Sequence, residues 1–227
     1  MTDIPILYED PWILVVNKPA GLPTQPTVDK SRPNLYQLLL DQKRWPTVAL
    51  HHRLDVPTSG VLLLVIHPAM NKPVSEMFQK HHFEKNYVFL TDKQPLQQAW
   101  EVQNYLKAQK MGGKSKMRVV KSGGDFAQTR FQVEKRSEKG AKIQASPVTG
   151  RMHQIRIHAS DSQVPILGDA LYYRIDRKAP RLMLHAQTLK FQHPKTGKDM
   201  IIEAPLWDDF LKVERNLLGA SNENAID

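Results

Sequence analysis

Hydrophobic and polar positions alternate along the chain with two periods, and these periods predict its secondary structure. Short apolar, β-prone runs bounded by turn residues predict strands, and such runs lie at 12–17, 60–66, 85–91, 127–134 and 141–148. Apolar residues at helical spacing predict helices over about 33–43, 71–82 and 150–160. Residues 189–205 indicate two further strands joined by the turn "HPKTG".

Two of the predicted helices carry specific expectations. In the first, we expect Ser31 to cap the helix and Pro33 to occupy its first turn. In the third, Met152, Ile155 and Ala159 form an apolar stripe. Helical spacing would then place Arg151, Gln154 and His158 on one face, and His153 and Arg156 on another.

The order of these elements predicts the fold class. Strands outnumber helices, and the helices are scattered among them, which is typical of an α+β fold with a mixed, largely antiparallel sheet flanked by helices. No internal repeat or long linker interrupts the pattern. We therefore expect a single domain over 1–227, with a core at about 8–212 and a flexible tail at 216–227.

Composition narrows the classes of function. The chain has 227 residues, of which 41% are hydrophobic, and a net charge of +9, which favours nucleic acid or an anionic membrane as partner. The apolar run "VLLLVI" is too short to span a bilayer, and the N-terminus does not resemble a signal peptide. Cysteine is absent from the sequence, which suits a reducing compartment, and we expect a cytoplasmic protein.

The segment "HHRLDVPTSG" at 51–60 holds one candidate catalytic group. If it is extended, Arg53 and Asp55 point the same way, and the guanidinium favours an ionised carboxylate that can act as nucleophile or base. An Arg–Asp pair that only fastens a loop to a strand is the alternative. Taken by itself, the segment favours that structural pair.

Three other segments are ambiguous by themselves. The segment "GRMHQIRIH" offers many hydrogen-bond donors for a phosphate or a carboxylate, or forms a solvated basic face. Tyr87 in "KNYVFL" offers a stacking ring, or is a half-buried strand residue. Residues 102–124 hold six cations and no acid, which indicates a flexible basic loop that contacts phosphate, or a solvated loop.

Patterns typical of metal and nucleotide sites are missing from the sequence. The histidines lack zinc-site spacing, and there is no glycine-rich phosphate loop and no GxSxG. We expect neither a metal nor a cofactor.

Six motifs occur in order: "ILVVNKPAGLPTQP", "HRLDVPTSGVLLL", "KNYVFL", "GRMHQIRIH", "PILGDALY" and "RLMLHAQTLKFQHPKTG". Together they resemble the motifs of RNA pseudouridine synthases of the RluA-like family, over about 12–205. The resemblance implies a catalytic fold with a central RNA-binding cleft. It also implies an isomerase that rejoins a uracil to its ribose through C5 instead of N1, without cofactor or metal.

The resemblance also implies roles for individual residues. Asp55 is the catalytic group, Tyr87 packs on the uracil and relays a proton, and Arg151 pairs with Asp55. Arg53 holds the target nucleotide outside the RNA stack. Further RNA contacts are expected from Lys18, His52, Lys85, Lys114, Lys116, Arg118, His153, Gln154 and Arg156.

The expected partner is tRNA, large-subunit rRNA or both, and we expect a monomer. Many family members carry an S4-type domain ahead of the first motif, which begins here near residue 8, so we expect the single-domain branch. A catalytically silent RNA-binding or ribosome-assembly protein on the same fold is the alternative. An Asp/His hydrolase that cleaves phosphodiesters is a third hypothesis, disfavoured because no multi-carboxylate metal pattern is present.

Overall fold

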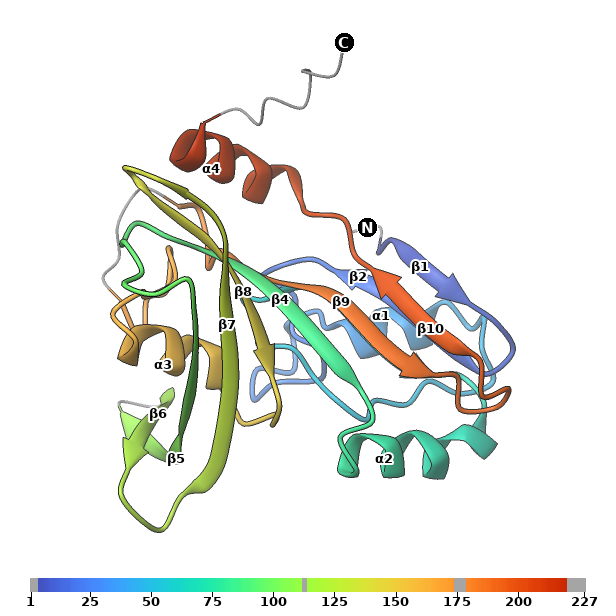
Figure 1. Ribbon diagram of the computed structural model, residues 1–227. Coiled ribbons are helices and arrows are strands. Elements are labelled where there is room, and N and C mark those ends of the chain that lie inside the picture. Colours follow the sequence, from blue (N-terminus) through green and yellow to red (C-terminus); the bar gives the residue numbers. More distant parts are fainter. Residues whose placement is uncertain (1–3, 112–113, 174–178, 220–227) are drawn as a thin grey trace. The chain divides into compact units, whose positions relative to one another are not determined.

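The computed structural model describes residues 4–111, 114–173 and 179–219 (Figure 1). The side chains of Met111 and Lys114 lie outside this description. The chain divides into two compact units, Met1–Asn86 with His185–Pro205 and Tyr87–Leu184 with Leu206–Asp227. We call these the first and the second unit and describe each by itself, so the single-domain organisation stays a prediction.

The first unit is built on strands in the order β1-β2-β3-β9-β10. Its pairs are antiparallel except β3 with β9, which run parallel. The middle strands β2 and β3 are buried along their whole length, which explains their continuous apolar sequence. The strands are β1 (Ile6–Glu9), β2 (Ile13–Lys18), β3 (Ser59–Val65), β9 (Leu184–Gln192) and β10 (Asp199–Glu203), and the helices are α1 (Leu35–Asp41) and α2 (Asn71–Gln79), the latter preceded by a 3₁₀ turn at Pro68–Met70.

The second unit contains an antiparallel sheet in the order β4-β8-β7-β5-β6. Helix α3 packs against β6, β7 and β8, and α4 packs against β7 and β8. The helices and the sheet enclose an apolar core that includes Phe89, Ile143 and Phe210. The elements are β4 (Glu84–Thr91), β5 (Ala99–Met111), β6 (Lys114–Val120), β7 (Asp125–Ser137), β8 (Gly140–Pro147), α3 (Gln154–Asp161) and α4 (Asp208–Leu218).

The predicted α+β class with a mixed, largely antiparallel sheet is confirmed. Every predicted strand and helix has a counterpart, while β1, β5, β6 and α4 were not predicted. The tail expected from residue 216 begins later, because α4 continues to Leu218 and buries Leu217 and Leu218 against the core of the second unit. The rest of that tail, 220–227, lies outside the described residues.

Three local predictions were wrong. Residues 102–124 were expected to be a loop, but β5 and β6 form a hairpin there because Leu106 and Met117 pack into a small apolar cluster. The cap of α1 is Asn34, whose Oδ1 accepts from the Gln37 N–H at 3.0 Å, whereas Ser31 binds Asp29. Helix α3 begins at Gln154, so the segment before it does not share a helical face with His158.

Candidate active site

The predicted catalytic residues are divided between the two units. Asp55 belongs to the first unit, and Tyr87 and Arg151 belong to the second. Each is therefore described in its own surroundings, and the pairing of Arg151 with Asp55 stays a prediction.

The segment around Asp55 is fastened to its neighbours through its backbone. Leu54 is buried, and its carbonyl accepts from the Thr24 hydroxyl at 3.1 Å. The carbonyl of Val56 accepts from the Gly21 N–H at 2.8 Å, and the Thr58 N–H donates to the Asp55 carbonyl at 3.0 Å. These bonds fix a tight turn that presents a half-buried Asp55, with an exposed Arg53 two residues earlier.

Lys18 supports this turn through its side chain. Its side chain is fully buried, and its ammonium group donates to the carbonyls of Pro19 at 2.9 Å, Leu22 at 2.8 Å and Val56 at 3.4 Å. A buried ammonium needs such acceptors to offset its desolvation. Lys18 thereby joins the "NKPAG" turn to the "HRLD" turn, and its RNA contact stays a prediction.

His52 also has a structural role in the first unit. Its Nε2 accepts from the Leu63 N–H at 3.0 Å, and its ring stacks on Phe78 with 4.6 Å between centroids. Burial, and to a lesser degree the charges of Lys85 and His51, lower the pKa of His52 to about 3. A neutral ring is thus locked between β3 and α2. Burial also lowers the pKa of Lys85, which lies half-buried in β4.

Gly60 and Ser59 explain the "TSG" that follows the turn. Gly60 has φ +116°, and a Cβ there would lie 2.2 Å from the Ala186 carbonyl oxygen on β9. The Ser59 hydroxyl lies 2.9 Å from Nδ1 of His185, whose Nε2 lies 3.0 Å from the Ala204 carbonyl. Sequence reasoning assigned no role to His185, and its place in the motif "RLMLHAQTL" was the available signal.

In the second unit, Arg151 lies in the loop before α3 with an exposed side chain. Its N–H donates to the Gln154 side-chain oxygen at 2.9 Å, and its Nε donates to the Phe126 carbonyl at 3.0 Å. The guanidinium is thereby directed along the start of β7. Tyr87 is half-buried in β4, opposite Ala145 of β8, and packs against the apolar core of the unit.

Gln154 is buried and makes four side-chain hydrogen bonds. Its amide NH₂ donates to the Gln128 carbonyl and the Thr129 hydroxyl, each at 2.9 Å, and its oxygen accepts from the Thr149 hydroxyl at 2.7 Å and from Arg151. This set uses both donors and both acceptor positions of the amide. Through these bonds Gln154 orients the backbone that carries Arg151, and its RNA contact stays a prediction.

The side chain of Arg156 likewise binds other protein side chains. It is buried and forms a bidentate ion pair with Asp169, in which Nε–Oδ2 and Nη2–Oδ1 are both 2.8 Å. Its guanidinium carbon also lies 5.3 Å from the ring centroid of Tyr172. These partners give Arg156 a structural role, and its RNA contact stays a prediction. Asp169 and Tyr172 lie in "PILGDALY", a motif to which sequence reasoning gave no residue roles.

Tyr172 connects α3 to the edge of the hairpin. Its hydroxyl accepts from the Met117 N–H of β6 at 2.7 Å and lies 3.1 Å from Nδ1 of His153. His153, predicted to contact RNA, is half-buried just before α3 with φ 53°. The ring of Tyr172 also receives Lys116, whose Nζ lies 4.9 Å from the centroid.

Among the predicted hairpin contacts, Arg118 is exposed and lies directly opposite Lys107, while Lys116 is half-buried beside Tyr172. The predicted contact of Lys114 lies outside the described side chains. Within the described ranges, no group of three or more His, Cys, Asp or Glu side chains could hold a metal ion. None of the described helices is long and apolar enough to cross a membrane.

Comparison with known proteins identifies the family. Residues 12–161 match the RNA pseudouridylate synthase family. The "Ribosomal large subunit pseudouridine synthase C" of Yersinia pestis is 37% identical over 208 residues, which are 88% of this chain and 65% of that relative. The "Dual-specificity RNA pseudouridine synthase RluA" of Escherichia coli is 33% identical over 204 residues, covering 88% of this chain and 92% of the relative.

Solved structures agree with this family. "Human RNA Pseudouridylate Synthase Domain Containing 4" has a TM-score of 0.73 and 28% identity, and covers 94% of this chain and 92% of its own. "Human RNA Pseudouridylate Synthase Domain Containing 1" has a TM-score of 0.75 at 24% identity, covers 90% of this chain and 84% of its own, and supports the fold. The chain belongs to the RluA-like family of RNA pseudouridine synthases, which are isomerases.

Proposed function

We propose that this chain converts a specific uridine of structured RNA, in tRNA or 23S-type rRNA, to pseudouridine, with Asp55 as the essential group. The observation that carries the proposal is the "HRLD" turn, which lies inside the family match. The buried Thr24 hydroxyl and the backbone N–H groups of Gly21 and Thr58 hold this turn through hydrogen bonds. The Asp55 side chain itself remains partly accessible. A fixed backbone with an accessible carboxylate is the arrangement that a catalytic group requires.

The reaction breaks the bond between N1 and the ribose and forms one between C5 and the ribose, while the C5 proton is lost and N1 gains one. Asp55 can attack the ribose, attack the pyrimidine, or abstract a ribose proton, and each version requires a carboxylate. The base must first leave the stack. Arg53, exposed beside Asp55, supplies a flat cation that holds the nucleotide outside.

We assign the remaining roles from the family to which the chain belongs. Tyr87 packs on the flipped uracil and relays a proton, and Arg151 offsets the charge of Asp55 next to polyanionic RNA. Arg118 and Lys116 contact phosphate from the hairpin. Four further residues hold the backbone in place and make no RNA contact, because their polar groups bind protein partners. They are Lys18, His52, Gln154 and Arg156.

Substituting Asp55→Asn tests the proposal. The amide preserves size but removes the carboxylate, so we expect pseudouridine formation to be abolished while the Kd for RNA changes less than about threefold. The measurement is tritium release from transcribed RNA labelled at C5 of uridine. Asp199→Asn, an exposed change on β10, is the control and should retain full turnover.

Comparable turnover by Asp55→Asn would remove Asp55 from its role. If the wild-type chain binds RNA but forms no pseudouridine in any cellular RNA, the silent RNA-binding alternative replaces the proposal.

A further inference from the structure

The second unit has an exposed sheet face that carries Arg118, to which a phosphate contact is assigned above, beside residues that have no role so far. Strand register places Tyr105 opposite Phe126, and Lys107 opposite Arg118. Because side chains two residues apart on a strand share a face, these four lie on one side of the sheet. We call them the outer face. The opposite side carries Leu106, Met117 and Ala127, which form an apolar cluster with Ile157 of α3.

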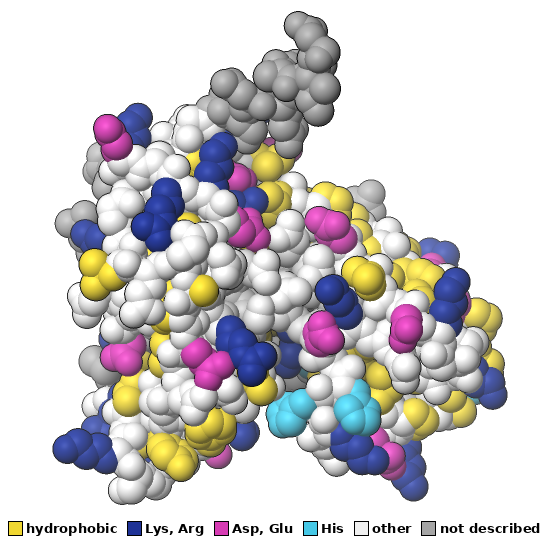
Figure 2. Space-filling view, viewed as in Figure 1, with side chains coloured by type: hydrophobic (Ala, Val, Ile, Leu, Met, Phe, Trp, Pro, Cys, Tyr) yellow, Lys and Arg dark blue, Asp and Glu magenta, His cyan; other side chains and the backbone are white. Residues whose placement is uncertain are grey.

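The aromatic pair of the outer face is open to solvent. Tyr105 is 45% exposed and Phe126 is 40% exposed, and their rings meet edge to face with 5.9 Å between centroids. Two neighbouring exposed rings on a rigid strand pair leave flat apolar surface uncovered. Figure 2 shows hydrophobic and Lys or Arg side chains next to one another over the region where Figure 1 places β5–β7.

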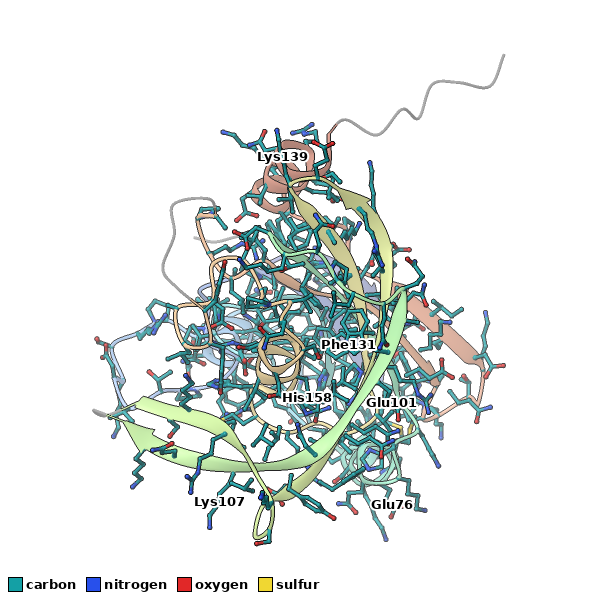
Figure 3. The ribbon with its side chains drawn as sticks, turned by 60° about the vertical axis from the view of Figure 1, so that its left-hand side comes forward. Glu76, Glu101, Lys107, Phe131, Lys139 and His158 are labelled. Carbon is teal, nitrogen blue, oxygen red and sulfur yellow. The ribbon has the colours of Figure 1, made fainter. Side chains whose placement is uncertain are left out.

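The charges beside the rings indicate which partner would cover them. Like charges directly across a strand pair are destabilising, and Lys107 and Arg118 occupy such a pair. Residues 102–124 include no acid, and the next residue, Asp125, lies opposite Leu106 and therefore on the other side of the sheet. Lys107 points away from the side that α3 covers (Figure 3). A polyanion with flat faces would cancel the repulsion and cover the rings.

We propose that the outer face binds unpaired nucleotides of the RNA that flank the target uridine. Their bases stack on Tyr105 and Phe126, and their phosphates contact Lys107 and Arg118, as in strand-binding surfaces that combine aromatic rings with cations. This inference rests on the proposed function. The Phe126 carbonyl accepts from Arg151 at 3.0 Å, so the outer face adjoins the loop that carries a residue predicted to act in catalysis.

The rings of the outer face should distinguish RNA with unpaired bases from duplex RNA. In a duplex the bases are stacked on one another and inaccessible to protein rings, whereas a loop can present them. The rings should therefore matter for RNA with unpaired bases and not for duplex. The two cations should matter for both, because both carry phosphates.

The experiment compares two RNA probes with equal numbers of phosphates: a stem-loop with a uridine-containing loop, and a fully paired duplex. We expect the double variant Tyr105→Ser/Phe126→Ser to bind the stem-loop at least about fivefold more weakly and the duplex as wild type does. The variant Tyr105→Phe/Phe126→Tyr keeps both rings and should bind both probes normally. Ile201→Ser, at a residue 66% exposed on β10, is the control for loss of a surface apolar group.

Lys107→Gln/Arg118→Gln should weaken binding of both probes. For the stem-loop it should reduce the slope of log Kd against log salt by about 0.7 for each single-strand phosphate that is no longer neutralised. Thermal unfolding shows whether each variant is folded. If the serine variant does not fold, Tyr105→Leu/Phe126→Leu retains apolar bulk without rings and should show the same selective loss.

Wild-type affinity for the stem-loop in the folded ring variants would overturn the inference, as would an equal loss on duplex or a wild-type chain that binds neither probe. Binding is measured apart from turnover, so the two proposals fail separately. A chain that forms pseudouridine but binds equally well without the rings loses only the outer face. A chain that forms none but shows the selective loss loses only the proposed activity.

Discussion

Gln154 and Arg156 lie within a motif dense in hydrogen-bond donors, yet both are buried and hydrogen-bonded to other protein groups. Sequence could show that donors cluster there but not where they point. Their partners, Thr129 and Asp169, lie 25 and 13 residues away along the chain. Arg151, which the structure leaves exposed, is the member of this motif most accessible to a ligand.

His158 and His52 should make the stability of the protein depend on pH. His158 is fully buried, with Nδ1 2.9 Å from the Thr129 hydroxyl and Nε2 2.9 Å from the Asn104 side-chain oxygen (Figure 3). Burial lowers the pKa of His158 to about 4, and that of His52 to about 3. In the unfolded chain both pKa values return to about 6.5. Between these values the unfolded chain binds protons that the native chain does not.

Stability should therefore be fully present above pH 6.5 and should fall as the pH decreases toward 4, with His158 alone contributing up to about 1.4 kcal/mol per pH unit. Urea unfolding from pH 7 to pH 4.5 measures the slope. His158→Gln should flatten it, whereas His82→Gln, at an exposed position, should not. An unchanged slope in His158→Gln would show that this histidine is not the group responsible.

At the scale of secondary structure, the turn that carries Asp55 depends on the close approach of β3 and β9. The two strands pair in parallel at only two positions, Ser59 with His185 and Gly60 with Ala186. The first pair adds a side-chain hydrogen bond, and the second needs a residue without a side chain. The "TSG" in the sequence is thus explained by strand packing.

Gly60→Ala should destabilise the protein by about 3 kcal/mol or more, because the new Cβ meets backbone and φ is positive. Gly197→Ala is the matched control, since φ there is +69° but no atom lies within 4 Å of the added Cβ. It should cost about 1 kcal/mol from backbone strain alone. Denaturant midpoints compare the two variants, and equal losses would contradict the role of the close approach.

A second connection between elements runs through Tyr172. Removing its hydroxyl in Tyr172→Phe leaves the Met117 N–H without this acceptor and should cost about 1 kcal/mol. The edge of β6 should open more often, so amide exchange at Met117 should accelerate. Tyr173→Phe, which removes a hydroxyl bonded to Asp92 at 2.9 Å, should leave the exchange at Met117 unchanged. Equal protection in both variants would exclude the connection.

At the scale of the whole molecule, the net charge of +9 overstates what RNA can contact. Lys18 and Arg156 count in the sum, but both are buried with protein partners. Charge and the motif order predicted an RNA enzyme, and apolar periodicity predicted the strands and the fold class. Neither reports burial, because burial depends on contacts between distant segments. Six cations, four of them between the two glycine pairs, hid the period of two in β5 and β6.

Lys18→Met tests the difference between charge and usable charge. The substitution removes the donors to three partly buried carbonyls, so it should lower stability by about 1–3 kcal/mol. The slope of log Kd against log salt for RNA should stay at the wild-type value, because a buried ammonium neutralises no phosphate. In Lys107→Gln/Arg118→Gln the slope should fall instead, because the two lost cations are those proposed to contact phosphate. A smaller slope in Lys18→Met would mean that this lysine does meet RNA.

The bond between Ser59 and His185 also sets a limit on when the active turn can form during synthesis. The two residues are 126 positions apart, and the acceptor for the other nitrogen of His185 lies at Ala204. Contacts of such sequence separation form slowly, and a nascent chain cannot make them before both partners have left the ribosome. The bonds of the turn to Gly21 and Thr24 can form early, but its attachment to β9 must wait until most of the protein has been translated.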